Sequence, residues 1–313
     1  MIYSNNMKEK TTKNKLAIII PAYKATFLRE AILSIASQTC KDFTLYIGDD
    51  CSPYNLKSII EPFESQLNII YKRFDENIGG TNLVAQWKRC IDLAQEEEWL
   101  WLFSDDDIME SDCVQNFYKT IEETNFKYDI YHFDVNIINN KGEIIRTPPQ
   151  YPQNLDAFTY YKNKLLGNLI SLVVENIFSR KIYNQTGGFE VFDLAWGSDT
   201  ATWVKFAASK TMYTIPNSKI LWRSSEENIS PNNTNSIVIR KIKALNDFLS
   251  WAYQYFQHYG KNVTLINIRA FIKRMRLFRT YITNKELDTS IKTFCKIHNI
   301  PWSLNIIKTL IKL

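Results

Sequence analysis

The stretch that decides the fold is residues 16–52, LAIIIPAYKATFLREAILSIASQTCKDFTLYIGDDCS. Its first five residues, LAIII, are all apolar and stop at Pro21, which is typical of a buried strand. The segment 26–39 repeats apolar residues at helical spacing, and FTLYIG at 43–48 predicts a second buried strand. A strand, an amphipathic helix and another strand in this order predict a βαβ unit with parallel strands.

The same alternation continues to about residue 110. We expect a short helix over 55–63, a strand over 68–74, a helix over 81–95 and a strand, WLWLF, over 99–103. Because parallel strands need crossover connections, helices should cover both faces of the resulting sheet.

The pattern changes after residue 128. Residues 128–145 predict a hairpin that turns at Asn139 to Gly142, and MYTIPNSKILWR at 212–223 predicts two short strands. From about 236 the chain reads as helical. The fold class predicted is therefore α/β, a Rossmann-like mixed sheet with helices on both faces, followed by a C-terminal helical region.

Polar residues gather where three of the predicted strands end. These clusters are Pro21-Ala22-Tyr23, Asp49-Asp50-Cys51-Ser52 and Asp105-Asp106-Asp107. Asp and Ser are also common in turns and helix caps, so a single cluster would carry little weight. Ligands of open α/β sheets bind beyond the carboxyl ends of the strands, and three clusters at three such ends favour a binding site.

Several classes of site are disfavoured by the composition. The five cysteines form no CxxC pair, the three histidines lie far apart, and neither GxGxxG nor GxxxxGK[ST] occurs. The N-terminal 15 residues are polar and lysine-rich, so we expect no signal peptide and a cytoplasmic protein. A nucleotide bound here would need its phosphates neutralised by Mg²⁺ or Mn²⁺ held on carboxylates.

At this point the chain resembles the family 2 glycosyltransferases, inverting nucleotide-sugar enzymes of the GT-A fold. The likeness runs through residues 16–52, NIGGTNL at 77–83, WLFSDDDIMESD at 101–112 and TGGFEVFDLAWGSDTATWVKF at 186–206. It covers roughly residues 16 to 225 and is strongest in the first 110.

The resemblance implies roles for the strand-end residues. Pro21, Ala22 and Tyr23 would line the nucleoside pocket, and Asp50 would accept the N3–H of uracil or thymine. Asn77, Gly79 and Gly80 would lie over the nucleotide. Asp105 would reach the ribose, Asp106 would bind the metal ion, and Asp107 would support them. The family pattern Asp-x-Asp-Asp has Ser104 at its first position here.

The second half would supply the general base. The family places it second in a Glu-Asp pair at the start of a helix, and here that pair reads Ser198-Asp199. Asp199 would take the proton of an acceptor hydroxyl, although Asp also caps helices well. Arg223 would approach the diphosphate. Trp196 could stack on a sugar, although a tryptophan is more often a core residue.

The C-terminal region is basic. Residues 240–313 carry 14 Lys and Arg against 3 Asp and Glu, a net charge of +11, which leaves about −6 for residues 1–239 of a chain with net charge +5. RAFIKRMRLFRTYI at 269–282 predicts a basic amphipathic helix, either a membrane-surface element or a helix packed on the body. No motif supports nucleic acid binding.

We therefore expect a disordered N-terminal extension (1–15), a GT-A domain (16–235) and a basic helical region (236–313). The domain would transfer a sugar from a UDP- or dTDP-sugar to a glycan or lipid-linked glycan, with inversion and with Mg²⁺ or Mn²⁺, in cell-surface polysaccharide synthesis. It would work in the cytoplasm, at the inner face of the membrane if the basic helices bind lipid. The alternatives are a sugar nucleotidyltransferase and a non-catalytic binding protein of the same fold.

Overall fold

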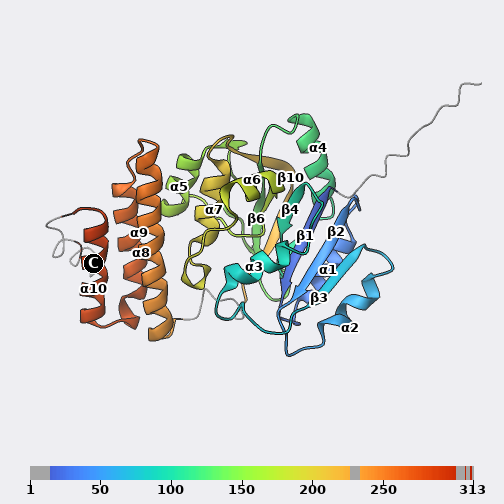
Figure 1. Cartoon of the computed structure of the whole chain (residues 1–313), viewed down its shortest axis with the longest axis horizontal. Coiled ribbons are helices and arrows are strands. Elements are labelled where there is room, and N and C mark those ends of the chain that lie inside the picture. Colours follow the sequence, from blue (N-terminus) through green and yellow to red (C-terminus); the bar gives the residue numbers. More distant parts are fainter. Residues whose placement is uncertain (1–14, 226–232, 301–306, 308–310, 312–313) are drawn as a thin grey trace, which may run out of the picture.

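A computed structural model describes residues 15–225 and 233–300, together with residues 307 and 311. A central sheet runs through the molecule with helices on both faces, and three C-terminal helices stand side by side at one end (Figure 1). Helices α1 (Leu28–Ala36) and α2 (Leu56–Ile60) lie at the opposite end of the molecule (Figure 1).

The sheet has the strand order β3-β2-β1-β4-β9-β6-β10-β5, with β7 paired to β6 and β8 to β10. The first four strands are parallel, as predicted, whereas β9 is antiparallel to both β4 and β6. The strands are β1 (Leu16–Ala22), β2 (Phe43–Asp49), β3 (Ile69–Arg73), β4 (Trp99–Leu102), β5 (Ile108–Met109), β6 (Ile130–Ile138), β7 (Ile144–Arg146), β8 (Asn154–Leu155), β9 (Asn176–Ser179) and β10 (Met212–Arg223).

The helices of the first 110 residues also confirm the predicted alternation. The helices are α1 (Leu28–Ala36), α2 (Leu56–Ile60), η1 (Glu61–Phe63), α3 (Leu83–Ile91), α4 (Cys113–Glu123), α5 (Ala157–Leu166), α6 (Arg180–Thr186), η2 (Asp193–Ala195), α7 (Ser198–Ala207), α8 (Asn235–His258), α9 (Thr264–Phe278), η3 (Arg279–Tyr281) and α10 (Asn284–Ile297). The predicted hairpin is confirmed as β6 and β7, closed by a hydrogen bond from Gly142 N to Asn139 O at 3.0 Å.

One strand prediction was wrong. Residues 212–223 form the single strand β10, which runs parallel to β6, and not two short strands. The register between the two shifts from Ile215 to Lys219, because Pro216 lacks an N–H for the ladder and Asn217 adopts a positive φ of 67°. The irregularity that suggested a turn in the sequence is a bulge in the structure.

Strand β1 shows how the sheet divides the core. Ile18 and Ile20 face the cluster beneath α1, α2 and α4, while Ala17 and Ile19 face the cluster shared with α3, α7 and α8. All four are completely buried, as expected for a central parallel strand covered on both faces. This two-sided burial is why the sequence LAIII has no polar alternation.

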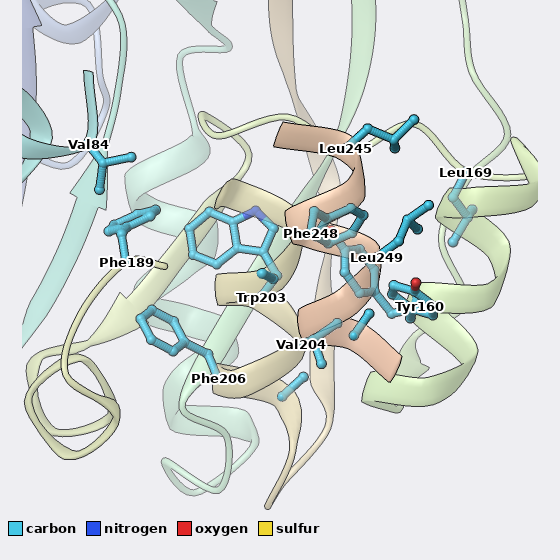
Figure 2. Packing of buried hydrophobic residues seen from close by; sticks show 14 of the residues in the cluster. Val84, Tyr160, Leu169, Phe189, Trp203, Val204, Phe206, Leu245, Phe248 and Leu249 are labelled. Atoms are coloured by element: carbon cyan, nitrogen blue, oxygen red, sulfur yellow. The ribbon is translucent and has the colours of Figure 1, made fainter. Parts of the chain in front are cut away.

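The C-terminal helices pack into the second of these clusters. Leu245, Phe248 and Leu249 of α8 lie against Trp203 of α7 and Tyr160 of α5 (Figure 2). The helical region and the sheet therefore share one continuous core. α8 begins at Asn235, and the division into separate domains at 235 stays a prediction.

The apolar face of α9 is buried within the protein. Phe271, Met275 and Phe278 are at most 4% exposed, and Phe271 stacks on Phe294 of α10 with ring centroids 4.2 Å apart. Ile307 and Ile311, the described residues of the final segment, are buried too. These residues are not available to lipid, and none of the helices in the described part combines the length and apolar character that crossing a membrane requires.

Candidate active site

The polar clusters at the ends of β1, β2 and β4 are brought together by strand pairing. Ala22 pairs with Asp49, and the backbone N–H of Asp50 donates to Ala22 O at 2.9 Å. On the other side of β1, Phe103 N donates to Ile19 O at 2.8 Å, which places the aspartates that follow beside the end of β1. The predicted gathering of these clusters at one edge of the sheet is confirmed.

Asp105 is bound to the segment after β1. Its Oδ2 accepts hydrogen bonds from the backbone N–H groups of Tyr23 at 2.9 Å and Lys24 at 2.8 Å. Pro21 and Ala22 fix the backbone that leads into this contact, while the Tyr23 side chain is 42% exposed at the rim. The other oxygen of this buried carboxylate, Oδ1, makes neither of these two backbone contacts.

Lys24 lies between two of these carboxylates, and this contact was not predicted from the sequence. Its ammonium group lies 3.4 Å from Asp105 Oδ1 and donates a hydrogen bond to Asp106 Oδ2. Burial lowers the pKa of Lys24, but the two carboxylates raise it more, so that it ends above its usual value. A lysine directly after a strand-end cluster was the available signal, although its partners only become visible once β1 and β4 are paired.

Asp106 and Asp107 point in different directions. Asp106 lies beside Ser104, whose Oγ accepts from Asp106 N at 3.1 Å and donates to Asp106 Oδ1, so Ser104 holds the carboxylate in place. Asp107 is 1% exposed and accepts from Arg223 N at 2.7 Å. Burial and the neighbouring Asp106 raise the pKa of Asp107 well above its usual value, which fits a supporting residue better than an ion ligand.

Arg223 is buried against the backbone and side chains of the aspartates that follow β4. Its side chain is completely buried and donates to Asp106 O at 2.9 Å, to the carbonyls of Asn139 and Asn140, and to Glu30 at 2.6 Å. The guanidinium also stacks on the ring of Phe27, 4.1 Å from its centroid. The structure shows a support for the loop of aspartates, and the contact of Arg223 with a diphosphate stays a prediction.

Asp50 connects the end of β2 to the glycine-containing loop before α3. It accepts hydrogen bonds from Ile78 N and Gly79 N, both at 2.9 Å, and from the guanidinium of Arg89. A Cβ at Gly79 would lie 2.5 Å from Asp50 Oδ2, so the close approach requires glycine there. Asn77 and Gly80 close the exposed turn of this loop, with Gly80 N donating to Asn77 Oδ1 at 3.0 Å.

Asp199 stands in the first turn of α7, apart from the strand-end carboxylates. Its neighbour Ser198, at the position of the family's glutamate, is completely buried and accepts a hydrogen bond from Phe192 N at 3.1 Å. Gly197 precedes them with a φ of +91°, and a Cβ there would come within 2.8 Å of the Phe248 ring. The start of α7 is thus placed by its packing on α8.

Asp199 lines a cavity of about 550 Å³ that lies between α3, α5, α7 and the helices α8 and α9. Much of its wall is apolar, and the aromatic side chains of Trp87, Trp196 and Phe248 are part of that wall. Three cationic residues complete the lining, namely Lys164, Lys273 and Arg274. The loop that Asp50 holds leads directly into α3, so this cavity adjoins the strand-end cluster through that helix.

A buried carboxylate, Glu175, lies close to the half-buried Asp199. Glu175 is 1% exposed and accepts from Leu172 N at 2.6 Å and Ser171 Oγ at 3.0 Å through Oε1, while Oε2 has no hydrogen-bond partner. Burial raises the pKa of Glu175 to about 7; Leu172, Lys164 and Ser171 oppose the rise, and Asp199 adds to it. Nothing in the sequence pattern singled this residue out, because it precedes a short buried strand.

The strand-end carboxylates fit a hard divalent cation in their chemistry. Mg²⁺ and Mn²⁺ are held by one or two carboxylates together with substrate phosphates, and Asp105 and Asp106 supply such oxygens at the rim. Within the described residues no three acidic, histidine or cysteine side chains converge on one point, so phosphate and water would complete the coordination.

The comparisons with known proteins agree with this geometry. Residues 17–187 match the model of glycosyl transferase family 2. The chain belongs to this family. The matched range includes Asp50 and all three aspartates after β4, while Asp199 lies beyond its end.

Individual relatives and structures are more distant. Poly(ribitol-phosphate) beta-N-acetylglucosaminyltransferase TarS of Staphylococcus aureus is 29% identical over 139 residues, which are 44% of this chain and 22% of the relative. The crystal structure of S. aureus TarS 1–349 in complex with UDP-GlcNAc has a TM-score of 0.57 at 14% identity, over 91% of this chain and 90% of the other. The mannosyltransferase PcManGT of Pyrobaculum calidifontis, in complex with GDP-Man and Mn²⁺, gives 0.54 at 13% identity, over 95% and 84%. These likenesses establish the GT-A fold with a C-terminal helical region.

Proposed function

We propose that this family 2 glycosyltransferase transfers a hexose or N-acetylhexosamine from a UDP- or dTDP-sugar to a glycan or lipid-linked acceptor, with inversion. The observation that carries the proposal is the division of its carboxylates into two groups. One group lies at the strand ends, where the family binds its nucleotide, and Asp199 lines the adjoining cavity with the buried Glu175 close to it. The solved neighbours that bind UDP-GlcNAc, UDP and GDP-Man support a nucleotide-sugar donor.

The donor side would be read by the groups at the strand ends. Asp50 would accept the N3–H of the base beside Pro21, Ala22 and Tyr23, and Asp105 would accept a ribose hydroxyl through its Oδ1. Asn77 and Gly80 would cover the nucleotide from the loop. Asp106 would hold Mg²⁺ or Mn²⁺, which when bound stabilises the negative charge of the departing diphosphate.

Asp199 would act on the acceptor. Its carboxylate would take the proton of the acceptor hydroxyl as that oxygen forms a bond to the anomeric carbon and the bond to the diphosphate breaks. Attack from the side opposite the leaving group inverts the anomeric centre. The only hydrogen bond that the Asp199 carboxylate accepts among the described residues is a weak one from Thr200 Oγ1 at 3.3 Å, so its oxygens are available to an acceptor.

The donor side can be tested by thermal-shift measurements with UDP-, dTDP- and GDP-sugars, with and without Mn²⁺. We expect a UDP- or dTDP-sugar to raise the melting temperature more in the presence of Mn²⁺, and Asp106→Asn to abolish the Mn²⁺-dependent part. Asp92→Asn, at the exposed end of α3, is the matched control and should behave like the wild type. Full Mn²⁺ dependence and full transfer in Asp106→Asn would show the metal role to be wrong.

One observation favours the alternative of a non-catalytic binding protein. Lys24 already neutralises the two aspartates that would otherwise attract a cation. Slow, Mn²⁺-dependent hydrolysis of a UDP-sugar would reject that alternative. A sugar nucleotidyltransferase would instead form pyrophosphate from a nucleoside triphosphate and a sugar phosphate, and no feature of the site favours it. The cytoplasmic location, the setting in polysaccharide synthesis and the peripheral membrane contact remain predictions.

A further inference from the structure

The cavity around Asp199 is basic. Lys164 reaches it from α5, and Lys273 and Arg274 reach it from α9, whereas Asp199 is the acidic residue of the lining. The two helices that carry these cations, α5 and α9, pack on one another. The cavity therefore carries an excess of positive charge beside the proposed general base.

None of these three cations forms an ion pair with a carboxylate among the residues that the structure describes. Lys164 donates a hydrogen bond to Ser171 O at 2.5 Å, and the Arg274 guanidinium lies 5.2 Å from the centre of the Trp196 ring. The Lys273 ammonium lies over Gly167, 2.6 Å from the point where a Cβ would stand. All three keep hydrogen-bond donors for a ligand.

Arg240, outside the cavity lining, differs from these three cations because it has a carboxylate partner. Arg240 of α8 pairs with Asp193 of η2, with Nη2 and Oδ1 2.6 Å apart, and this interaction raises the pKa of Arg240 above its usual value. Leu194, the residue directly after Asp193, belongs to the cavity lining, and the cations of that lining have no carboxylate partner among the described residues. Burial lowers the pKa of Lys164, and the nearby Asp199 and Glu175 oppose this shift.

The rest of the wall suits the body of a carbohydrate. Trp87 and Trp196 supply aromatic surface, and Leu245 and Phe248 supply aliphatic and aromatic contacts for the C–H faces of sugar rings. A cavity of about 550 Å³ is large enough for a ligand of two or three sugar-sized units, on the usual scale of small-molecule sites.

We infer that this cavity binds an anionic acceptor, a glycan or polyol chain whose phosphodiester or carboxylate groups contact Lys273 and Arg274 while one of its hydroxyls lies at Asp199. The inference rests on the proposed function, because it identifies the chemical class of the substrate on the acceptor side. Charge-assisted hydrogen bonds from the guanidinium would fix the register of the chain relative to the base. The neutral sugars of the acceptor would contact the apolar wall.

The test measures binding of three probes of similar length to the full chain with UDP and Mn²⁺ present. The probes are a poly(glycerol phosphate) oligomer, an oligogalacturonide and a neutral malto-oligosaccharide. We expect at least one anionic probe to bind about tenfold more tightly than the neutral one. The phosphodiester and carboxylate probes then distinguish the two sources of negative charge. Equal affinity for all three probes would overturn the inference.

Substitutions locate the effect within the cavity. Arg274→Gln should weaken binding of the preferred anionic probe about tenfold and leave the neutral probe within twofold. Lys273→Gln, a second exposed position of α9, should act in the same direction. Arg269→Gln is the matched control, since it removes the same charge from an exposed position of α9 outside the cavity lining, and it should have no effect.

Two results would contradict the inference even if anionic probes bind well. An equal loss in Arg269→Gln would show a general attraction to a basic surface. A loss of UDP affinity in Arg274→Gln that matches the loss of probe affinity would assign the arginine to the donor diphosphate. Failure of the proposed function is distinguishable from both, because it would appear as absent binding of nucleotide sugars in the wild type, whatever the acceptor probes do.

Discussion

The two halves of the proposed site differ in how their charged groups are partnered. At the strand ends, Asp50, Asp105 and Asp106 each accept hydrogen bonds from protein donors and each has a cationic neighbour. In the cavity, Asp199 accepts one weak hydrogen bond, and the cations around it have no carboxylate partner among the described residues. Groups of the first kind contribute to stability as well as to binding, whereas groups of the second kind are held in place by packing and remain available to a ligand.

The largest expected effect comes from the cavity. Asp199→Asn should lower the rate of sugar transfer by about 10² to 10⁴-fold, because the amide cannot take the acceptor proton. The free energy of unfolding should change by less than about 0.5 kcal/mol, since Asp199 contributes little hydrogen bonding. Transfer rates with saturating donor, together with urea denaturation, check both parts. Loss of stability in this variant would remove the contrast between the two halves.

At the strand ends we expect a substitution to lower the stability of the protein. Asp50→Ala should destabilise the protein by about 3 kcal/mol, because it leaves Ile78 N, Gly79 N and the Arg89 guanidinium without their acceptor. Urea denaturation measures the loss. Asp92→Ala, which removes an exposed partner of Lys88, is the control and should cost less than about 1 kcal/mol. Equal effects of the two substitutions would contradict the assignment of Asp50 to a structural network.

Glu175 should make the free energy of unfolding depend on pH. Its folded pKa of about 7 lies above the ordinary value of 4.5, so the folded state keeps this proton to higher pH than the unfolded state. The contribution to stability is therefore complete below about pH 4.5 and is lost as the pH rises to about 7, by about 3 kcal/mol in total. In Glu175→Gln this part of the slope should disappear in denaturation measured from pH 4.5 to 8. The exposed Glu143→Gln should retain the wild-type slope.

The smallest effect concerns Lys24. Lys24→Met should increase the affinity for Mn²⁺ about tenfold, measured by calorimetry in the absence of nucleotide, because the ammonium no longer competes for Asp105 and Asp106. Lys57→Met, which removes an exposed charge on α2, is the control. An unchanged or weaker Mn²⁺ affinity in Lys24→Met would mean that Lys24 and the ion do not share these carboxylates.

The strand-end half of the proposed site could largely be anticipated from the sequence. Its residues follow strands directly, so the parallel order of β1, β2 and β4 places Asp50 and Asp105 at one edge once the alternation of strands and helices is recognised. Lys24 escaped prediction because a long side chain has many reachable partners, and only the pairing of β1 with β4 selects Asp105 and Asp106. The single strand β10 was missed because a bulge and a turn share the same residues, proline and asparagine.

The cavity half of the proposed site could be anticipated only at Asp199. The other charged residues of the cavity are Lys164, Lys273 and Arg274. In their helices charged residues alternate with apolar core residues, as in any helix with one face in solvent, and this pattern does not indicate a cavity. The apolar face of 269–282 suggested a surface for lipid as readily as one for protein, and the structure shows it packed on Phe294 and the core.

By itself the sequence determined the α/β order, the gathering of carboxylates at the strand ends and the family to which the chain belongs, because these depend on local periodicity and on residues next to one another. Only the tertiary structure decided which cation meets those carboxylates and which charges surround Asp199. The reason is physical: strand and helix formation is governed by spacing along the chain, whereas the partner of a long charged side chain is set by the packing of elements that are distant in sequence.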